Sequence, residues 1–113
     1  MRLALTALAL TLALPIAAQA ASFDCNKARS PDEKAICANT ALNDKDVKMS
    51  VLYDINKRTL AMGGRGSLMD AQQQWLKDRR TCGANRACLN RAYDRRLGEL
   101  ERSMERIYRN GPF

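Results

Sequence analysis

The chain of 113 residues contains no histidine, one tryptophan and only 5% aromatic residues. Without histidine it lacks the ordinary Ser-His or Cys-His pair that activates a nucleophile. Its acidic residues are scattered, with no evident apolar pocket to raise the pKa of one carboxyl for glycoside hydrolysis. Zinc is disfavoured because no Cys-x-x-Cys occurs. Few aromatic rings are present to stack on bases. We therefore expect no enzyme, no metal, no cofactor and no nucleic-acid partner.

Long hydrophobic runs are absent except at the start of the chain, where Leu3–Leu14 is apolar or small throughout. Arg2 precedes this run and Ala18-Gln19-Ala20 follows it, as in a cleavable signal peptide. The run is too short for a membrane span, which needs about 20 residues. We predict a signal peptide over residues 1–20 and a mature chain starting near Ala21, periplasmic or secreted. No cysteine at the cleavage point offers a lipoprotein anchor.

The mature chain, residues 21–113, is long enough for one small domain with a thin core. Four cysteines in an oxidising compartment fit two disulfides, which small exported domains often need. Three pairings are possible. Cys82 and Cys88 flank an expected turn between helices, and Cys25 can fold back onto Cys37. This geometry favours the pairs 25–37 and 82–88, in a domain that we expect to be monomeric.

Apolar residues recur with a helical period, and no segment alternates convincingly at period two. We predict an all-α fold, a small disulfide-stapled helical bundle in which a short N-terminal helix is followed by three longer ones. The expected helices span about residues 31–38, 41–62, 67–82 and 86–107. Gly63-Gly64-Arg65-Gly66 is predicted to stop the second helix and to form a mobile link, because glycine permits left-handed backbone.

Polar residues interrupt the apolar stripes of three predicted helices, at Asp46, Gln72, Arg79 and Arg96. A buried carboxylate needs a partner, since an uncompensated charge in the interior is costly. We therefore predict that Asp46 pairs with Arg79 or Arg96 inside the bundle and that Gln72 completes the hydrogen bonds. The alternatives are that the long side chains snorkel to water or that these residues serve a partner directly.

Positive charge predominates in the second half of the chain. Without the predicted signal peptide there are 18 Lys and Arg against 12 Asp and Glu, a net charge of +6. From Lys77 onward, ten basic residues face five acidic ones. Such a surface can attract anionic envelope components, and Arg91, Arg95 and Arg102 are the candidates for that contact. The alternative is an ordinary solvated helix face.

Several motifs together resemble one known family. They are Phe23-Asp24-Cys25, Ser30-Pro31-x-Glu33-Lys34-Ala35-Ile36-Cys37, Leu52-Tyr53, Gln72-x-x-Trp75, Arg79-x-x-Cys82-Gly83, Cys88-Leu89, Tyr93 and Arg96. This set is similar to the N-terminal domain of the lysozyme inhibitor LprI family, which consists of bacterial exported proteins. The resemblance implies an exported, non-enzymatic binding protein with a lysozyme as its possible partner.

Two functions follow from the sequence. The first is lysozyme-inhibitor-like binding, in which the expected glycine loop, residues 63–67, enters the partner and presents Arg65 to its active-site carboxylates. A plain linker between helices is the alternative for that loop. The second function is binding to anionic surfaces of the cell envelope, or maintenance of the envelope, through the arginine-rich last helix.

Overall fold

The computed structural model describes residues 22–110, and four α-helices account for most of this range. The part of the chain so described contains no strand, which confirms the predicted all-α class. The predicted signal peptide lies outside the described residues. The elements in chain order are a short 3-10 helix η1 (Cys25–Lys27), α1 (Pro31–Ala38), α2 (Thr40–Thr59), α3 (Met62–Thr81) and α4 (Arg86–Asn110).

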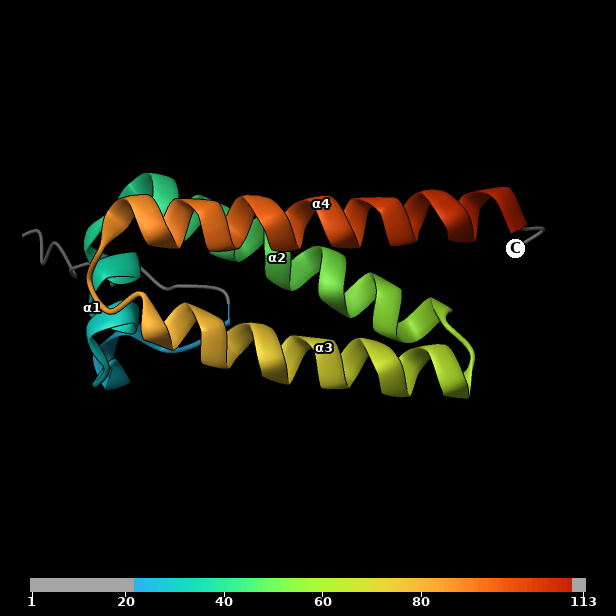
Figure 1. Ribbon diagram of the computed structural model, residues 1–113, viewed down its shortest axis with the longest axis horizontal. Helices are drawn as coiled ribbons and strands as arrows, with labels where there is room; N and C mark the ends of the chain where they lie inside the picture. Colours follow the sequence, from blue (N-terminus) through green and yellow to red (C-terminus); the bar gives the residue numbers. More distant parts are fainter. Residues whose placement is uncertain (1–21, 111–113) are drawn as a thin grey trace, which may run out of the picture.

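The three long helices are arranged as an opening wedge (Figure 1). At one end, α1 and η1 lie beside the turn that joins α3 to α4. From this end α2 runs along α4 and then diverges from it, so that its last turns lie beside the start of α3 (Figure 1). The C-terminal half of α4 consequently has fewer neighbours than its first half, and the wedge is open at that end.

The hydrophobic core occupies the closed part of the wedge and draws side chains from all four α-helices. Trp75 and Tyr93, both positions of the motif set, are buried with their ring centroids 5.1 Å apart in an edge-to-face arrangement. The indole Nε1 of Trp75 donates to the carbonyl of Ala92 at 2.9 Å. The other large core residues are Ile36, Leu42, Met49, Leu68, Leu89, Leu97 and Leu100.

Local sequence signals explain most helix ends. The Asn39 side chain caps α2 by accepting from the Leu42 amide at 3.0 Å. The Asn85 side chain accepts in the same way from the Cys88 amide at the start of α4. Between α3 and α4, Gly83 has φ of +55°, a left-handed conformation that suits glycine after a helix. Both predicted disulfides, Cys25–Cys37 and Cys82–Cys88, are confirmed.

The predicted glycine loop is wrong, because Gly63–Gly66 belongs to the first turns of α3. The connection from α2 is only Leu60 and Ala61, both with extended backbone. The α3 ladder begins with the Arg65 amide donating to the Ala61 carbonyl at 2.8 Å. The Arg65 side chain donates from Nε to the carbonyl of Lys57 at 2.9 Å, at the C-terminus of α2. These contacts hold the glycines helical despite their low helix propensity.

Candidate functional site

A buried ion pair joins the first helix to the third. The Arg79 Nε atom donates to Oδ2 of Asp32 at 2.9 Å, and both side chains are almost fully buried. The guanidinium also lies 5.4 Å from the ring centroid of Phe23 and 5.7 Å from that of Trp75. The aromatic rings and the carboxylate both favour the positive charge of Arg79, although its Nη1 atom and Oδ1 of Asp32 have no hydrogen-bond partner within residues 22–110.

A second buried carboxylate, Asp46 of α2, lies next to this pair. Its Oδ1 atom accepts from the Tyr93 hydroxyl at 2.9 Å and lies 3.9 Å from Nη1 of Arg79. Ser22 supplies two more donors, its backbone amide at 3.0 Å and its hydroxyl at 2.7 Å. The arm before η1 is therefore tied to the interior of the bundle by a carboxylate.

The second buried arginine, Arg96 of α4, has a different set of partners. Its Nε atom donates to Oε1 of Gln72 at 2.9 Å, and its Nη1 atom donates to Oε2 of Glu99 at 2.9 Å. The Gln72 amide nitrogen in turn lies 3.2 Å from the sulfur of Met49. Arg96 Nη2 has no hydrogen-bond partner within residues 22–110.

The four predicted polar positions are all buried, but they divide into two groups rather than one. Asp46 pairs with Arg79 and not with Arg96, whereas Gln72 accepts a hydrogen bond from Arg96. The principal partner of Arg79 is Asp32, which lies in the predicted helix over residues 31–38 but was not among the predicted buried polar positions. Asp32 lies four residues before the buried Ile36, and that spacing on one helix face was the available signal.

The surroundings of Asp32 and Tyr93 shift the pKa of each group away from neutral pH. Burial raises the pKa of Asp32, but the Ser30 hydroxyl and the hydrogen bond and charge of Arg79 outweigh it and hold that pKa below the ordinary 3.8. Burial and the Asp46 charge raise the pKa of Tyr93 far above its ordinary value. Tyr93 therefore remains a hydrogen-bond donor, and the network acts as a structural clasp between helices.

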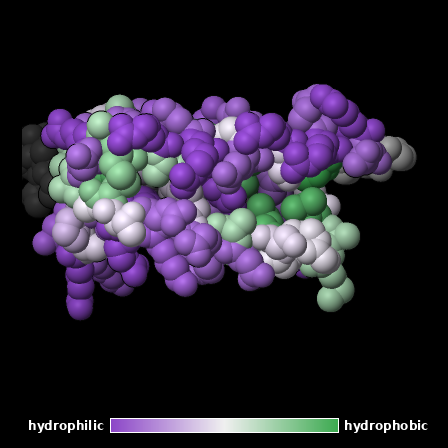
Figure 2. Space-filling view, in the orientation of Figure 1, coloured by the Kyte–Doolittle hydropathy of each residue, from purple (hydrophilic) through white to green (hydrophobic). Residues whose placement is uncertain are grey.

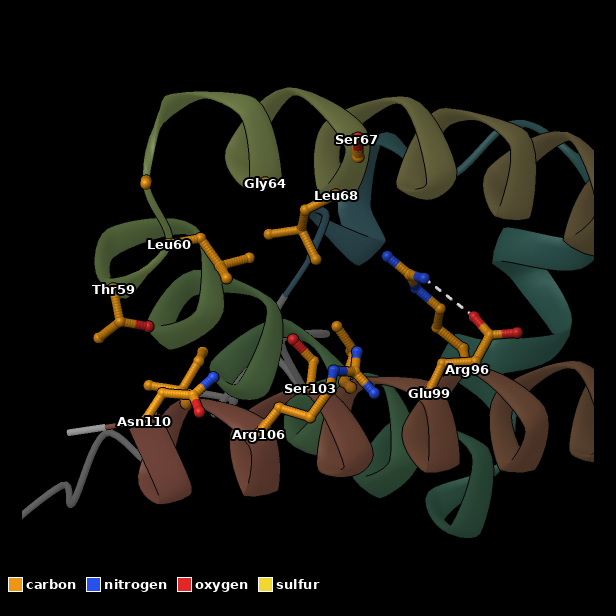
Figure 3. Close-up of a pocket in the computed structure, with 13 residues that line it drawn as sticks. Thr59, Leu60, Gly64, Ser67, Leu68, Arg96, Glu99, Ser103, Arg106 and Asn110 are labelled. Carbon is orange, nitrogen blue, oxygen red and sulfur yellow. Dashed lines mark hydrogen bonds and ion pairs between the residues drawn. The ribbon is translucent and has the colours of Figure 1, made fainter.

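An open groove of 710 Å³ lies between the α2–α3 turn and the C-terminal half of α4 (Figure 3). Figure 2 shows hydrophobic side chains exposed in this hollow, below the hydrophilic surface of α4. The apolar lining residues are Leu60, Ala61, Leu68, Leu100 and Ile107. The polar lining residues include Ser67, Arg96, Glu99, Ser103, Arg106 and Asn110. The groove is the main feature that the sequence reasoning missed, because it arises where three separate helices diverge.

The predicted partner-binding arginines of α4 share one exposed face. Arg91, Arg95, Arg102 and also Arg109 fall within about 40° of one another on a helix that turns about 100° per residue, and all four are exposed. We call these four residues the outer arginine stripe. Arg95 lies 3.4 Å from Asp78, and Arg109 lies 3.3 Å from Glu105.

Arg91 and Arg102 have no ion pair within the described range 22–110, so their charges are available to a partner. Arg65 is also exposed, but its guanidinium contacts the end of α2 rather than projecting from a loop. The contribution of Arg65 to binding stays a prediction.

Two further features of the described residues concern membranes and metals. None of the helices within residues 22–110 is long and apolar enough to cross a membrane. The same residues contain no group of three or more His, Cys, Asp or Glu side chains placed to hold a metal ion.

Comparison with known proteins gives one match. The family model described as lysozyme inhibitor LprI matches residues 25–110, from the first disulfide cysteine to the end of α4. The matched range contains both disulfides, all four α-helices, the groove and the outer arginine stripe. No curated protein and no solved structure gives a significant match.

Proposed function

The chain belongs to the lysozyme inhibitor LprI family, and from this premise we propose that its mature form is an exported, non-enzymatic protein that binds a lysozyme and slows cell-wall hydrolysis. The observation that carries the proposal is the family match over residues 25–110. The disulfide-stapled bundle supports it, because a domain held by two disulfides suits an oxidising compartment outside the cytoplasm.

The surface that we assign to the partner is the outer arginine stripe. Lysozyme cleaves its substrate with two carboxyl groups in an open cleft, so an inhibitor that blocks the cleft needs a convex, basic element. The C-terminal half of α4 projects at the open end of the wedge (Figure 1) and carries Arg102 and Arg109. The buried arginines cannot serve this role without breaking the interior network.

Clearing of a bacterial cell-wall suspension by lysozyme, followed by turbidity, tests the proposal. The purified mature protein is added in increasing molar ratio, and lysozymes of several classes are compared. We expect saturable slowing with one-to-one stoichiometry. No slowing of any lysozyme at a large molar excess would falsify the assignment.

A pair of charge-matched double variants tests the surface. Arg91→Glu with Arg102→Glu reverses the two arginines of the stripe that lack ion pairs, and we expect about tenfold weaker inhibition. Arg80→Glu with Arg86→Glu makes the same change in net charge at exposed positions off the stripe, and we expect little effect. Equal loss in both double variants would show that net charge, and not the stripe, controls binding.

A second candidate function is binding to anionic components of the cell envelope through the same stripe. The specific observation that favours it is the alignment of four exposed arginines, two of them without an ion pair, in a chain with excess positive charge. Cosedimentation with vesicles rich in anionic lipid should then fall steeply with salt, because exposed charges are screened beyond about 8–10 Å at ordinary ionic strength. Charge reversal at Arg91, Arg95 and Arg102 should abolish it. Vesicle binding without lysozyme inhibition would favour this second function.

A further inference from the structure

Hydrogen-bond donors gather at the inner end of the groove, away from Asn110. The Arg96 side chain is 3% exposed, and its Nη2 atom has no partner within the described part of the chain. Arg106 is exposed and forms no ion pair within residues 22–110, and its side chain extends back along the groove toward Arg96 (Figure 3). Ser103 adds a hydroxyl to the same lining. A guanidinium only donates hydrogen bonds, so the two arginines of this cluster offer donors and no acceptor.

The charge balance of the groove also favours an anion. Glu99 is the one carboxylate in its lining, and it is already engaged by Nη1 of Arg96 at 2.9 Å. Two guanidinium groups therefore face one carboxylate. Nη2 of Arg96 is shielded from water and therefore also from a ligand oxygen, so Arg96 acts on an anion in the groove through its charge. The exposed guanidinium of Arg106 is the group that can donate hydrogen bonds to that anion.

The rest of the groove is suited to an aliphatic chain. Leu60 lines it from the α2–α3 turn, Leu68 from α3, and Leu100 and Ile107 from α4. The volume of 710 Å³ falls within the range of about 300–1,000 Å³ found for small-ligand pockets. An inorganic anion would leave these apolar side chains facing water, and a neutral aliphatic molecule would leave the arginines without an acceptor.

We propose that this groove is a binding site for an aliphatic monocarboxylate of the fatty-acid type. The carboxylate lies between Arg96 and Arg106, and the chain lies along Leu60, Leu68, Leu100 and Ile107. Arg106 borders the outer arginine stripe, about 20° from Arg95 around the helix, whereas Leu100 and Ile107 lie on another face. The proposal concerns a small-molecule ligand of the groove and does not depend on the binding of a lysozyme. The proposed ligand is a small molecule. The alternative occupant of the groove is a segment of a partner protein, and the experiment distinguishes the two.

The test is a titration of the mature protein with dodecanoate below its micelle concentration, followed by backbone amide NMR shifts and by calorimetry. Acetate supplies the charge without the chain, and dodecyltrimethylammonium supplies the chain with the opposite charge. We expect saturable one-to-one binding of dodecanoate, with shifts at the amides of Gly64, Ser67 and Ser103. Both control ligands should bind at least about tenfold more weakly.

Two matched variants locate the carboxylate without disturbing the buried network. Arg106→Gln should weaken dodecanoate binding about tenfold, because it removes the exposed guanidinium of the groove. Arg86→Gln removes an equally exposed arginine from the start of the same helix, away from the groove and from the outer arginine stripe, and should leave the affinity unchanged.

The proposal is overturned by any of four results: no saturable binding of dodecanoate, equal binding of the cationic amphiphile, equal effects of the two variants, or shifts confined to the outer arginine stripe. Binding of a leucine-terminated peptide in the groove when dodecanoate does not bind would assign the groove to a protein partner instead.

Discussion

Replacing glycines in the first turns of α3 should stabilise the protein. Gly63 and Gly66 lie in a helix, and a Cβ atom added at either position meets nothing within 4 Å. The substitutions Gly63→Ala and Gly66→Ala therefore add no clash and remove conformational freedom from the unfolded chain. In a helix interior, alanine is favoured over glycine by about 0.8–1.0 kcal/mol. The two changes together should raise the free energy of unfolding by about 1.5–2 kcal/mol.

The same segment lacks other helix-stabilising features. The residue before α3 is Ala61, whose methyl side chain cannot accept a capping hydrogen bond, and the first turn of α3 contains no acidic residue. We therefore expect the amides of residues 63–67 to exchange hydrogen faster than those in the middle of α3, and to exchange more slowly in the double variant.

Denaturant unfolding and amide hydrogen exchange of the wild-type and variant proteins are the measurements. A gain of about 1.5–2 kcal/mol at unchanged denaturant slope corresponds to a rise in Tm of roughly 6–16 °C for a domain of this size. Gly83→Ala is the control, because φ of +55° at that position disfavours a side chain and the variant should lose stability. The reasoning is refuted if Gly63→Ala and Gly66→Ala leave the free energy of unfolding unchanged or lower it.

Two further predictions concern the buried network. Asp32→Asn removes the principal counter-charge of Arg79 and leaves Asp46, 3.9 Å away, as the remaining one; we expect a cost of about 3–5 kcal/mol. The folded-state pKa of Asp32 lies below 3.8, so the ionised carboxylate stabilises the folded protein above pH 3.8, and this stabilisation is lost as the pH falls through the folded-state pKa. In denaturant unfolding, the difference in stability between wild type and Asp32→Asn should therefore shrink in acid. Tyr93→Phe removes the hydroxyl that donates to buried Asp46 and should lower the free energy of unfolding by about 1–3 kcal/mol. Tyr53 is partly buried and its hydroxyl forms no hydrogen bond within residues 22–110, so Tyr53→Phe should be near neutral by the same measurement. Equal costs for the two tyrosine variants would show that the Asp46 contact contributes nothing.

The elements that the sequence predicted well depend on near neighbours along the chain. The predicted break between residues 82 and 86 follows from local chemistry, because the Asn85 side chain caps α4 and Gly83 tolerates a left-handed backbone. The two disulfides join cysteines only 12 and 6 residues apart, across a turn or a short arm. The burial of Trp75 and Tyr93 follows from helical periodicity. In each case the deciding interaction is local, so the amino-acid order carries enough information.

Other features were decided only when the helices packed. Residues 63–66 have the composition of a loop, and their helix exists because Arg65 is held against the end of α2. Periodicity placed Asp46 and Arg79 in the interior, but only the docking of α1 brought Asp32 to 2.9 Å from that arginine. The groove is a property of the angle between α2 and α4, which no single segment encodes. The sequence by itself determined the helices and the cysteine pairs, and the exported location stays a prediction. The tertiary structure decided which buried charges meet and where the groove opens, because both depend on distances between segments far apart in the chain.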